Sequence, residues 1–138
     1  MLWGTPQKPP LADRLIVCHL HLQTNMENLI ERTLQWGNAK GITGPAGTGT
    51  PHAQATKMLE EANETFDAVD FADMPNVEHS KIAESLTQIK DGIGDTCVTL
   101  ILLAEMYGWT LAECLSHALE IIEKRTGKMV GGNFVKDQ

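Results

Sequence analysis

The sequence has 138 residues and a mass of 15.1 kDa, a length that suits one domain able to bury roughly two thirds of its unfolded surface. Asp and Glu outnumber Lys and Arg by 18 to 11, which gives a formal net charge of -7. This charge argues against duplex nucleic acid and anionic membranes as partners, because both need a basic surface. A polyphosphate ligand would need added positive charge, and a divalent metal ion is the obvious source.

The cysteines and the apolar runs indicate where the chain is expected to reside. Cys18, Cys97 and Cys114 are odd in number and have no CxxC spacing, which favours reduced thiols over disulfides or a zinc site. The longest apolar runs, residues 15–22 and 98–104, are shorter than the ~18 residues that a membrane span needs. The first run also lacks the cleavage pattern of a signal peptide. We therefore expect a cytoplasmic protein.

The N-terminal segment is predicted to be separate from the domain. Residues 1–25 are expected to form an arm, since three prolines among the first ten residues prevent an early helix. The domain is expected over residues 26–138. Thr24 and Glu27 fit a capping box ahead of a helix that runs to about Lys40, and a glycine-rich connector, residues 41–50, follows.

The connector and the next two helices have clear boundary signals. The glycines of the connector resemble the start of a phosphate-binding loop, but that motif needs a lysine where Thr50 stands. Thr50 instead suits an N-cap and Pro51 a first helical position, which predicts a second helix to about Phe71. A third helix is predicted over residues 77–107 and is ended by Gly108.

The remaining residues predict a fourth helix and a tail. Thr110 and Glu113 form a capping box for a helix to about Thr126, with Gly127 as its C-terminal stop. Residues 128–138 are expected to pack back as an extended tail, because no strand-turn-strand pattern is recognised. The predicted fold class is all-α: a compact four-helix bundle with an N-terminal arm and an extended C-terminal tail.

The second helix has an apolar stripe opposite an acidic face. Acidic residues three and four positions apart repel one another, and only one lysine is near enough to relieve them. Carboxylates that converge in this way suit Mg²⁺, although a solvated charged face is the alternative. The stripe consists of Ala55, Leu59, Ala62, Phe66 and Val69, and the opposite face consists of Lys57, Glu60, Glu61 and Glu64.

The third helix supplies further carboxylates beside a buried segment. Residues 98–104 are apolar nearly all round and should be buried, which places Asp95 at the edge of buried surface. Asp91 lies one helical turn before Asp95 on the same face. Gly92 and Gly94 each cost ~1 kcal/mol relative to alanine in mid-helix, which indicates close approach of a neighbouring helix or a ligand.

Several of these residues together resemble phage-type MazG proteins, which are all-α nucleoside triphosphate pyrophosphohydrolases. The resemblance covers residues 26–136 and includes the EExxE pattern at 60–64, although Gly92 stands where the family's ExxD motif has a glutamate. Its other elements are residues 35–42 (QWGNAKGI), Gln54, Lys57, Asp91 to Asp95, residues 125–129 (RTGKM) and residues 134–136 (FVK).

The resemblance implies a function and roles for residues. It implies Mg²⁺, for which Mn²⁺ can substitute, an activated water that attacks the α-phosphorus, and the release of pyrophosphate. Glu61 or Glu64 would take the proton of that water. The implied metal ligands are Glu60, Glu61, Glu64 and Asp95, with Asp91 second. The implied substrate contacts are Trp36 with the base, Asn38 and Gln54 with base edges, and Lys57, Arg125 and Lys128 with phosphates.

The substrate and the assembly state are also expectations. Phage relatives act on deoxynucleotide pools, which favours a dNTP, with a guanine nucleotide as the candidate base and the host cytoplasm as the location. The apolar third helix favours a homo-oligomer, a dimer or tetramer, with the active site near the subunit contact. The alternative function is a non-catalytic helical interaction or regulatory module, which Gly92 in place of glutamate keeps open. A di-iron bundle is excluded, because it needs Glu-x-x-His pairs that this sequence lacks.

Overall fold

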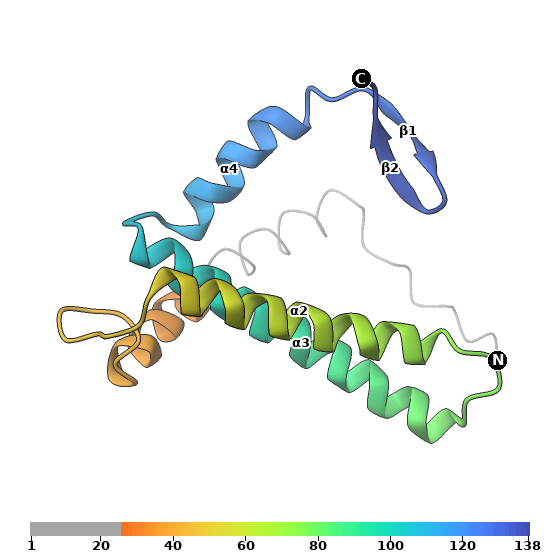
Figure 1. Ribbon diagram of the computed structural model, residues 1–138, viewed down its shortest axis with the longest axis horizontal. Coiled ribbons are helices and arrows are strands. Elements are labelled where there is room, and N and C mark those ends of the chain that lie inside the picture. The colour runs from red at the N-terminus through yellow and green to blue at the C-terminus, as the bar shows by residue number, and fades with distance from the viewer. Residues whose placement is uncertain (1–25) are drawn as a thin grey trace, which may run out of the picture.

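The computed structural model describes residues 26–138, which form four helices and one β-hairpin (Figure 1). The predicted all-α class is therefore confirmed. The first helix occupies residues 26–39, and its predicted cap at Thr24 lies outside the described residues. The other elements are α2 (Pro51–Ala72), α3 (His79–Met106), α4 (Leu111–Ile122), β1 (Gly127–Val130) and β2 (Asn133–Lys136).

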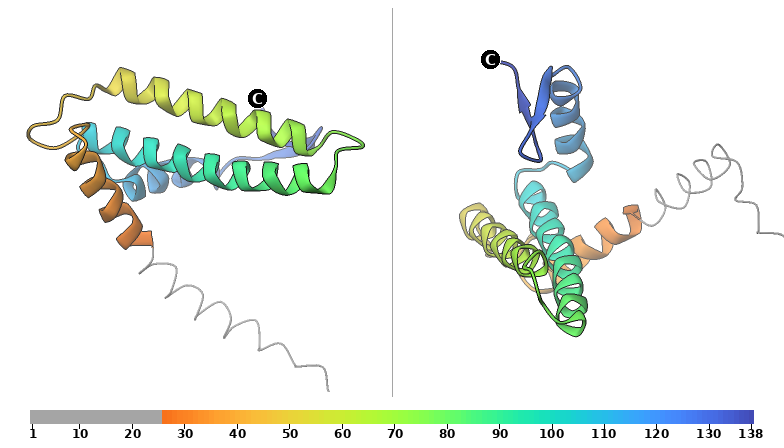
Figure 2. Two further views of the ribbon diagram at one scale, coloured as in Figure 1. Left: turned by 90° about the horizontal axis from the view of Figure 1, so that it is seen from below. Right: turned by 90° about the vertical axis from the view of Figure 1, so that its right-hand side faces the viewer.

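Helices α2 and α3 form an antiparallel pair along the long axis of the molecule (Figures 1 and 2). Their buried residues recur every seven positions, which is the spacing of a coiled-coil seam. Most of these residues are small or polar, so the two backbones approach closely and bulky side chains lie outside the seam. The seam consists of Gln54, Glu61 and Ala68 on α2 and Ser85, Gly92 and Thr99 on α3.

The closest approach within the seam is at Gly92. A Cβ atom at this position would overlap Thr65 Oγ1 and would lie 3.1 Å from Thr65 Cβ. The predicted close helix approach is therefore confirmed at Gly92. It is wrong at Gly94, where a Cβ would meet no atom within 4 Å. Gly92 thus has a steric reason to be glycine, and Gly94 has none in this structure.

The apolar core lies at the C-terminal end of α3. Leu102 is 1% exposed, and Ile101 and Ala104 are also buried, which confirms the predicted burial of this segment. The first helix crosses α3 here, because a Cβ at Gly37 would lie only 2.5 Å from Leu102 Cδ2. Among the described residues, Ala68 is the one other buried hydrophobic residue. The core that a single chain encloses is therefore small.

The apolar stripe of α2 does not face α3. Leu59 is 59% exposed and Phe66 is 66% exposed, and Val69 is also exposed. The helix instead turns its seam residues toward α3. A small seam residue such as Ala68 lets the two helix backbones come closer than the bulky side chains of the stripe would. The stripe is left on the surface of the chain.

The chain turns sharply after α3 and then forms a separate arm. Gly108, with φ +75°, follows the end of α3. The predicted capping box starts α4: Thr110 Oγ1 accepts a hydrogen bond from the Glu113 backbone N–H, and the Glu113 carboxylate accepts one from Thr110 N–H at 2.7 Å. No residue of α4 is buried. The helix and the hairpin after it extend away from α2 and α3 (Figure 1).

No single helix of the described residues is long and apolar enough to cross a membrane. Helices α3 and α4, which are bent by 97° at the break between them, have the length and apolar composition of a span only when they are taken together.

The C-terminal prediction is wrong in two respects. Helix α4 ends at Ile122, and Gly127 begins strand β1 instead of stopping a helix. The tail is a β-hairpin whose two-residue turn is Gly131-Gly132, with φ +55° and +81°, the signs that a type I′ turn requires. Gly127 is needed because a Cβ there would overlap the Val135 carbonyl oxygen. The hairpin residues are all exposed, so the tail does not pack back.

The two glycines of α3 predict opposite effects of alanine on stability. Gly92→Ala should lower the free energy of unfolding by about 1–3 kcal/mol, because the new methyl group overlaps Thr65. Gly94→Ala should raise it by up to about 1 kcal/mol, because alanine favours the helix and meets open space. Chemical denaturation followed by circular dichroism at one protein concentration measures both. Equal stability of the two variants would contradict the close approach.

Candidate functional site

A cleft of about 420 Å³ lies between α2 and α3 and is lined by carboxylates from both helices. The antiparallel pairing brings the two predicted acidic segments to opposite walls of this cleft. Gly92 lies in the lining between them. The acidic residues are Glu61, Glu64 and Asp67 of α2 and Asp91 and Asp95 of α3.

The helical spacing explains how these side chains share the cleft. Glu61 and Gly92 are seam residues, so they lie where the two helices are nearest. Glu64 follows Glu61 by one turn, and Asp95 follows Asp91 by one turn, so each helix presents its acids in one row. Asp95 is exposed, which differs from its predicted place at the edge of buried surface.

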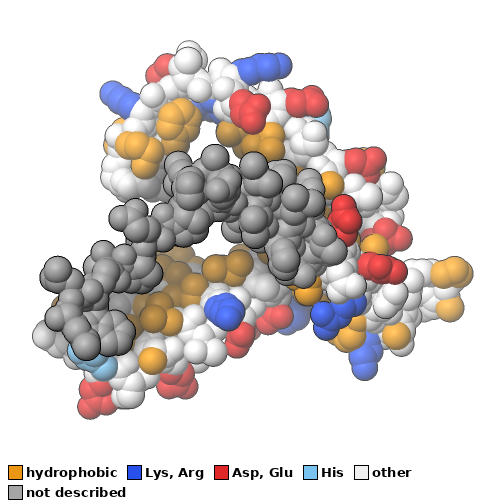
Figure 3. Space-filling view, turned by 180° about the vertical axis from the view of Figure 1, so that it is seen from behind, with side chains coloured by type: hydrophobic (Ala, Val, Ile, Leu, Met, Phe, Trp, Pro, Cys, Tyr) orange, Lys and Arg blue, Asp and Glu red, His pale blue; other side chains and the backbone are white. Residues whose placement is uncertain are grey.

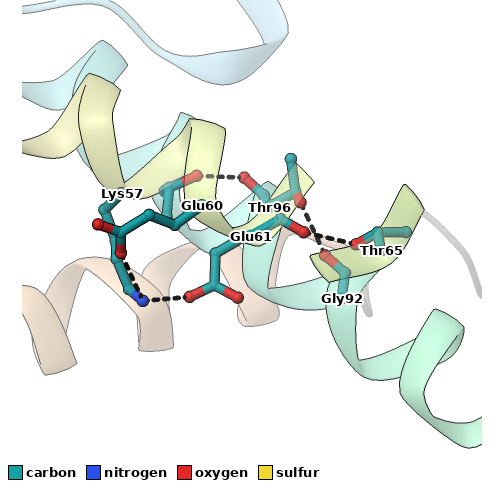
Figure 4. Close-up of polar contacts among 7 residues, drawn as sticks. Lys57, Glu60, Glu61, Thr65, Gly92 and Thr96 are labelled. Carbon is teal, nitrogen blue, oxygen red and sulfur yellow. Dashed lines mark hydrogen bonds and ion pairs between the residues drawn. The ribbon is translucent and has the colours of Figure 1, made fainter. Parts of the chain in front are cut away.

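Lys57 is paired with two glutamates at one end of the cluster (Figure 4). Its Nζ lies 2.7 Å from Glu61 Oε1 and 3.2 Å from Glu60 Oε2. The Glu61 side chain is only 12% exposed, whereas that of Glu60 is 56% exposed and does not line the cleft. Hydrogen bonds to Glu61 and then to Glu60 raise the pKa of the Lys57 ammonium above its ordinary value. The lysine therefore stays charged beside the acids.

Threonine hydroxyls in and beside the seam bond to the backbone of their own helix (Figure 4). Thr65 Oγ1 donates to the Glu61 carbonyl oxygen, and Thr96 Oγ1 donates to the Gly92 carbonyl oxygen, each at 2.7 Å. Thr99 Oγ1 donates in the same way to the Thr96 carbonyl oxygen. These hydroxyls are satisfied within the helices, so the polar side chains that line the cleft are the carboxylates and the amide of Gln88.

The donor set fits a hard cation in kind. Carboxylate oxygens are the protein ligands that Mg²⁺ and Mn²⁺ prefer. Within residues 26–138, however, no three His, Cys, Asp or Glu side chains lie close enough to share one ion. Coordination of an ion by this cleft would therefore require rotation of its carboxylate side chains. The ion pair with Lys57 restrains the Glu61 side chain against such rotation.

A second cavity, of about 680 Å³, adjoins the acidic cleft. It is an open hollow lined by residues of the first helix and of α3, and Asp95 lines both cavities. Trp36, which is 47% exposed, forms part of its wall, and Arg32 supplies a positive charge. The remaining lining is Leu29, Thr33, Gln35, Ala39 and Val98. A ligand with an aromatic and an anionic part matches this combination.

The other predicted substrate residues lie elsewhere. Asn38 Oδ1 accepts a hydrogen bond from Thr43 Oγ1 at 2.8 Å, which holds the connector after the first helix. Gln54 is buried in the seam, where its Nε2 lies 3.5 Å from the Thr99 carbonyl oxygen. Arg125 and Lys128 lie beyond α4, and none of these four predicted residues lines either cavity.

Two charged residues of the site were not singled out from the sequence. Asp67 lines the acidic cleft, and it lies three residues after Glu64, so it continues the acidic row by one more turn. Arg32 lies four residues before Trp36, so the two share one face of the first helix. Helical spacing could have found both residues.

Comparison with models of known protein families, with curated proteins and with solved structures finds no match for this chain. Its function is therefore inferred from the residues of the cleft and of the adjoining cavity, together with the motifs of the sequence.

Proposed function

We propose that this chain is a metal-dependent nucleoside triphosphate pyrophosphohydrolase of the phage MazG type. It would convert a nucleoside or deoxynucleoside triphosphate into the monophosphate and pyrophosphate. The observation that carries the proposal is the carboxylate cleft between α2 and α3, which adjoins the cavity of Trp36 and Arg32 through Asp95. A nucleotide has the matching two halves, a metal-binding polyphosphate and an aromatic base.

The carboxylates of the cleft would serve two purposes. Glu61, Glu64, Asp91 and Asp95 would hold Mg²⁺ or Mn²⁺, which supplies charge neutralisation for the triphosphate and acidifies a coordinated water. Glu64 is the better placed of the two predicted bases, since it is exposed in the cleft while Lys57 engages Glu61. It would accept the proton of the attacking water.

The adjoining cavity would accommodate the nucleoside. Trp36 offers a partly exposed indole face on which a base can stack, beside the apolar side chains of the cavity wall. Arg32 is the cationic side chain in the lining of this cavity, and it would contact a phosphate or the sugar of the nucleotide. A deoxynucleotide is the proposed substrate class, with a guanine base as the candidate.

Turnover and its products test the proposed reaction. The protein with Mg²⁺ or Mn²⁺ should convert at least one NTP or dNTP into monophosphate and pyrophosphate, separated by chromatography. Glu61→Gln should lower kcat by about 100-fold or more while the circular dichroism spectrum is kept, because a carboxylate that would hold the metal is lost. Glu84→Gln, at an exposed glutamate of α3 outside the cleft lining, is the matched control. Release of orthophosphate with a diphosphate, or no turnover, would refute the proposal.

The tryptophans allow a test of the base site. Trp36→Ala should raise KM by about tenfold and change kcat little, since a stacked base contributes about 1–3 kcal/mol to binding. Trp109→Ala is the control, because Trp109 stacks on Tyr107 with ring centroids 5.3 Å apart, outside the lining of both cavities. An equal effect of the two substitutions on KM would argue against a base site at Trp36.

We also propose that the chain is a homo-oligomer, a dimer or tetramer. Large hydrophobic residues are exposed on every described helix and on the hairpin, and Figure 3 shows hydrophobic side chains on one face of the molecule. Exposed apolar surface of this extent is typical of a subunit interface. The α2 stripe is one such face, and its large exposed residues are Leu59, Phe66 and Val69.

The alternative function, a non-catalytic helical interaction module, shares this expectation of assembly. It is favoured by the lack of a preformed three-residue metal group in the described part of the chain and by the absence of a side chain at Gly92. The turnover experiment distinguishes the two functions, because only the enzyme consumes nucleotide.

The α2 stripe can be tested by charge introduction. Phe66→Glu should shift the protein toward the monomer in sedimentation equilibrium, because a carboxylate would be buried in the interface. Ser80→Glu adds the same charge at an exposed polar position and should leave the mass unchanged. A wild-type protein that is monomeric at micromolar concentration would contradict the proposed assembly.

A further inference from the structure

One carboxylate of the acidic cleft, Glu61, is already paired with a cation of the protein's own. The Lys57 ammonium lies 2.7 Å from Glu61 Oε1 and 3.2 Å from Glu60 Oε2, and so joins two of the three glutamates of the EExxE pattern (Figure 4). Figure 4 shows the Glu61 carboxylate turned toward this ammonium. Lys57 precedes Glu61 by one helical turn, a spacing that brings the two side chains together on α2.

The position of Glu61 explains why a counter-ion is needed there. Glu61 occupies the seam, its side chain is 12% exposed, and other carboxylates line the same cleft. A carboxylate removed from water in this way is costly unless a positive charge pairs with it. Among the described residues, Lys57 is the one cation within ion-pair distance of Glu61.

We propose that Lys57 is the resident counter-ion of the cleft, and that a divalent cation binds Glu61 by displacing the lysine ammonium. The proposal rests on the proposed metal-dependent function. Lysine suits this exchange, since its charge is compact and strongly hydrated and its four-carbon chain can turn away without moving the helix. The displaced ammonium stays at the edge of the cleft, where it can contact the phosphates of an incoming nucleotide.

The exchange has a consequence for binding. A free metal ion must compete with the ion pair, so the cleft has a lower affinity for it than the number of carboxylates suggests. A nucleotide that brings its own metal ion offers phosphate oxygens to Lys57 at the same moment. Metal and nucleotide therefore favour each other's binding through one side chain.

Metal affinity without nucleotide tests the exchange. Titration with Mn²⁺, followed by electron paramagnetic resonance and by calorimetry, should give Lys57→Gln a Kd about three- to tenfold lower than that of the wild type, since the competing pair is gone. Lys90→Gln removes an equal charge next to Asp91 without breaking an ion pair of the described residues, and its Kd should change less than about twofold.

Two further measurements distinguish the proposed exchange from a general loss of stability in Lys57→Gln. Lys57→Arg keeps the charge and should keep the Mn²⁺ affinity within about twofold of the wild type. The rise of the melting temperature that saturating Mn²⁺ produces should be larger for Lys57→Gln than for the wild type, because the metal then supplies the missing counter-charge. A Lys57→Gln protein that folds only with Mn²⁺ would support the proposal for the same reason.

The outcomes separate the two proposals. Equal or weaker Mn²⁺ binding by Lys57→Gln, with measurable binding by the wild type, would overturn the role of Lys57 and leave the metal site standing. A similar gain in Lys90→Gln would also overturn it, because general charge would then explain the effect. No Mn²⁺ binding by either the wild type or Lys57→Gln would overturn the metal site and the exchange together.

Discussion

The close approach of α2 and α3 at Gly92 is the constraint on which the rest of the structure depends. A seam of small and polar residues at seven-residue spacing lets the two helices pair, and the absence of a side chain at Gly92 admits Thr65. The pairing sets the acidic rows on opposite walls of one cleft. It also turns the bulky stripe that includes Phe66 away from α3 and onto the surface, so the packing that builds the cleft also exposes large apolar side chains.

Much of the fold could be predicted from local signals. The caps at Thr50 and Thr110 start their helices as expected, because a side-chain oxygen that meets a free backbone N–H depends on a few adjacent residues. The hairpin was missed although Gly131-Gly132 is a recognised turn signal, because its strands of four residues show little alternation. Which face of α2 packs on α3 could not be predicted from hydrophobicity, since Glu61 is buried and Leu59 is exposed.

The acidic residues of the candidate site could be predicted better than the residues expected to contact substrate. The helical period placed Glu61 with Glu64, and Asp91 with Asp95, because residues on one helix face stay together whatever the tertiary arrangement. It also included Glu60, which does not line the cleft. Residues remote in sequence were harder to assign: Gln54 belongs to the seam, Asn38 holds a loop, and Arg125 lies beyond α4. Their polar groups either bond to other parts of the protein or lie apart from the cleft. Which partner a polar side chain finds depends on its three-dimensional neighbours, and residue spacing does not specify these.

The exposed hairpin has a consequence for how molecules can join. A sheet of two strands has an open edge on each side, and each edge presents backbone N–H and C=O groups that can pair with a strand of another molecule. Unlimited addition of this kind leads to fibres. Lys128 and Lys136 place a charge on each strand, and such charges oppose continuous stacking of like edges. The lysines of the tail therefore discourage open-ended growth by edge pairing.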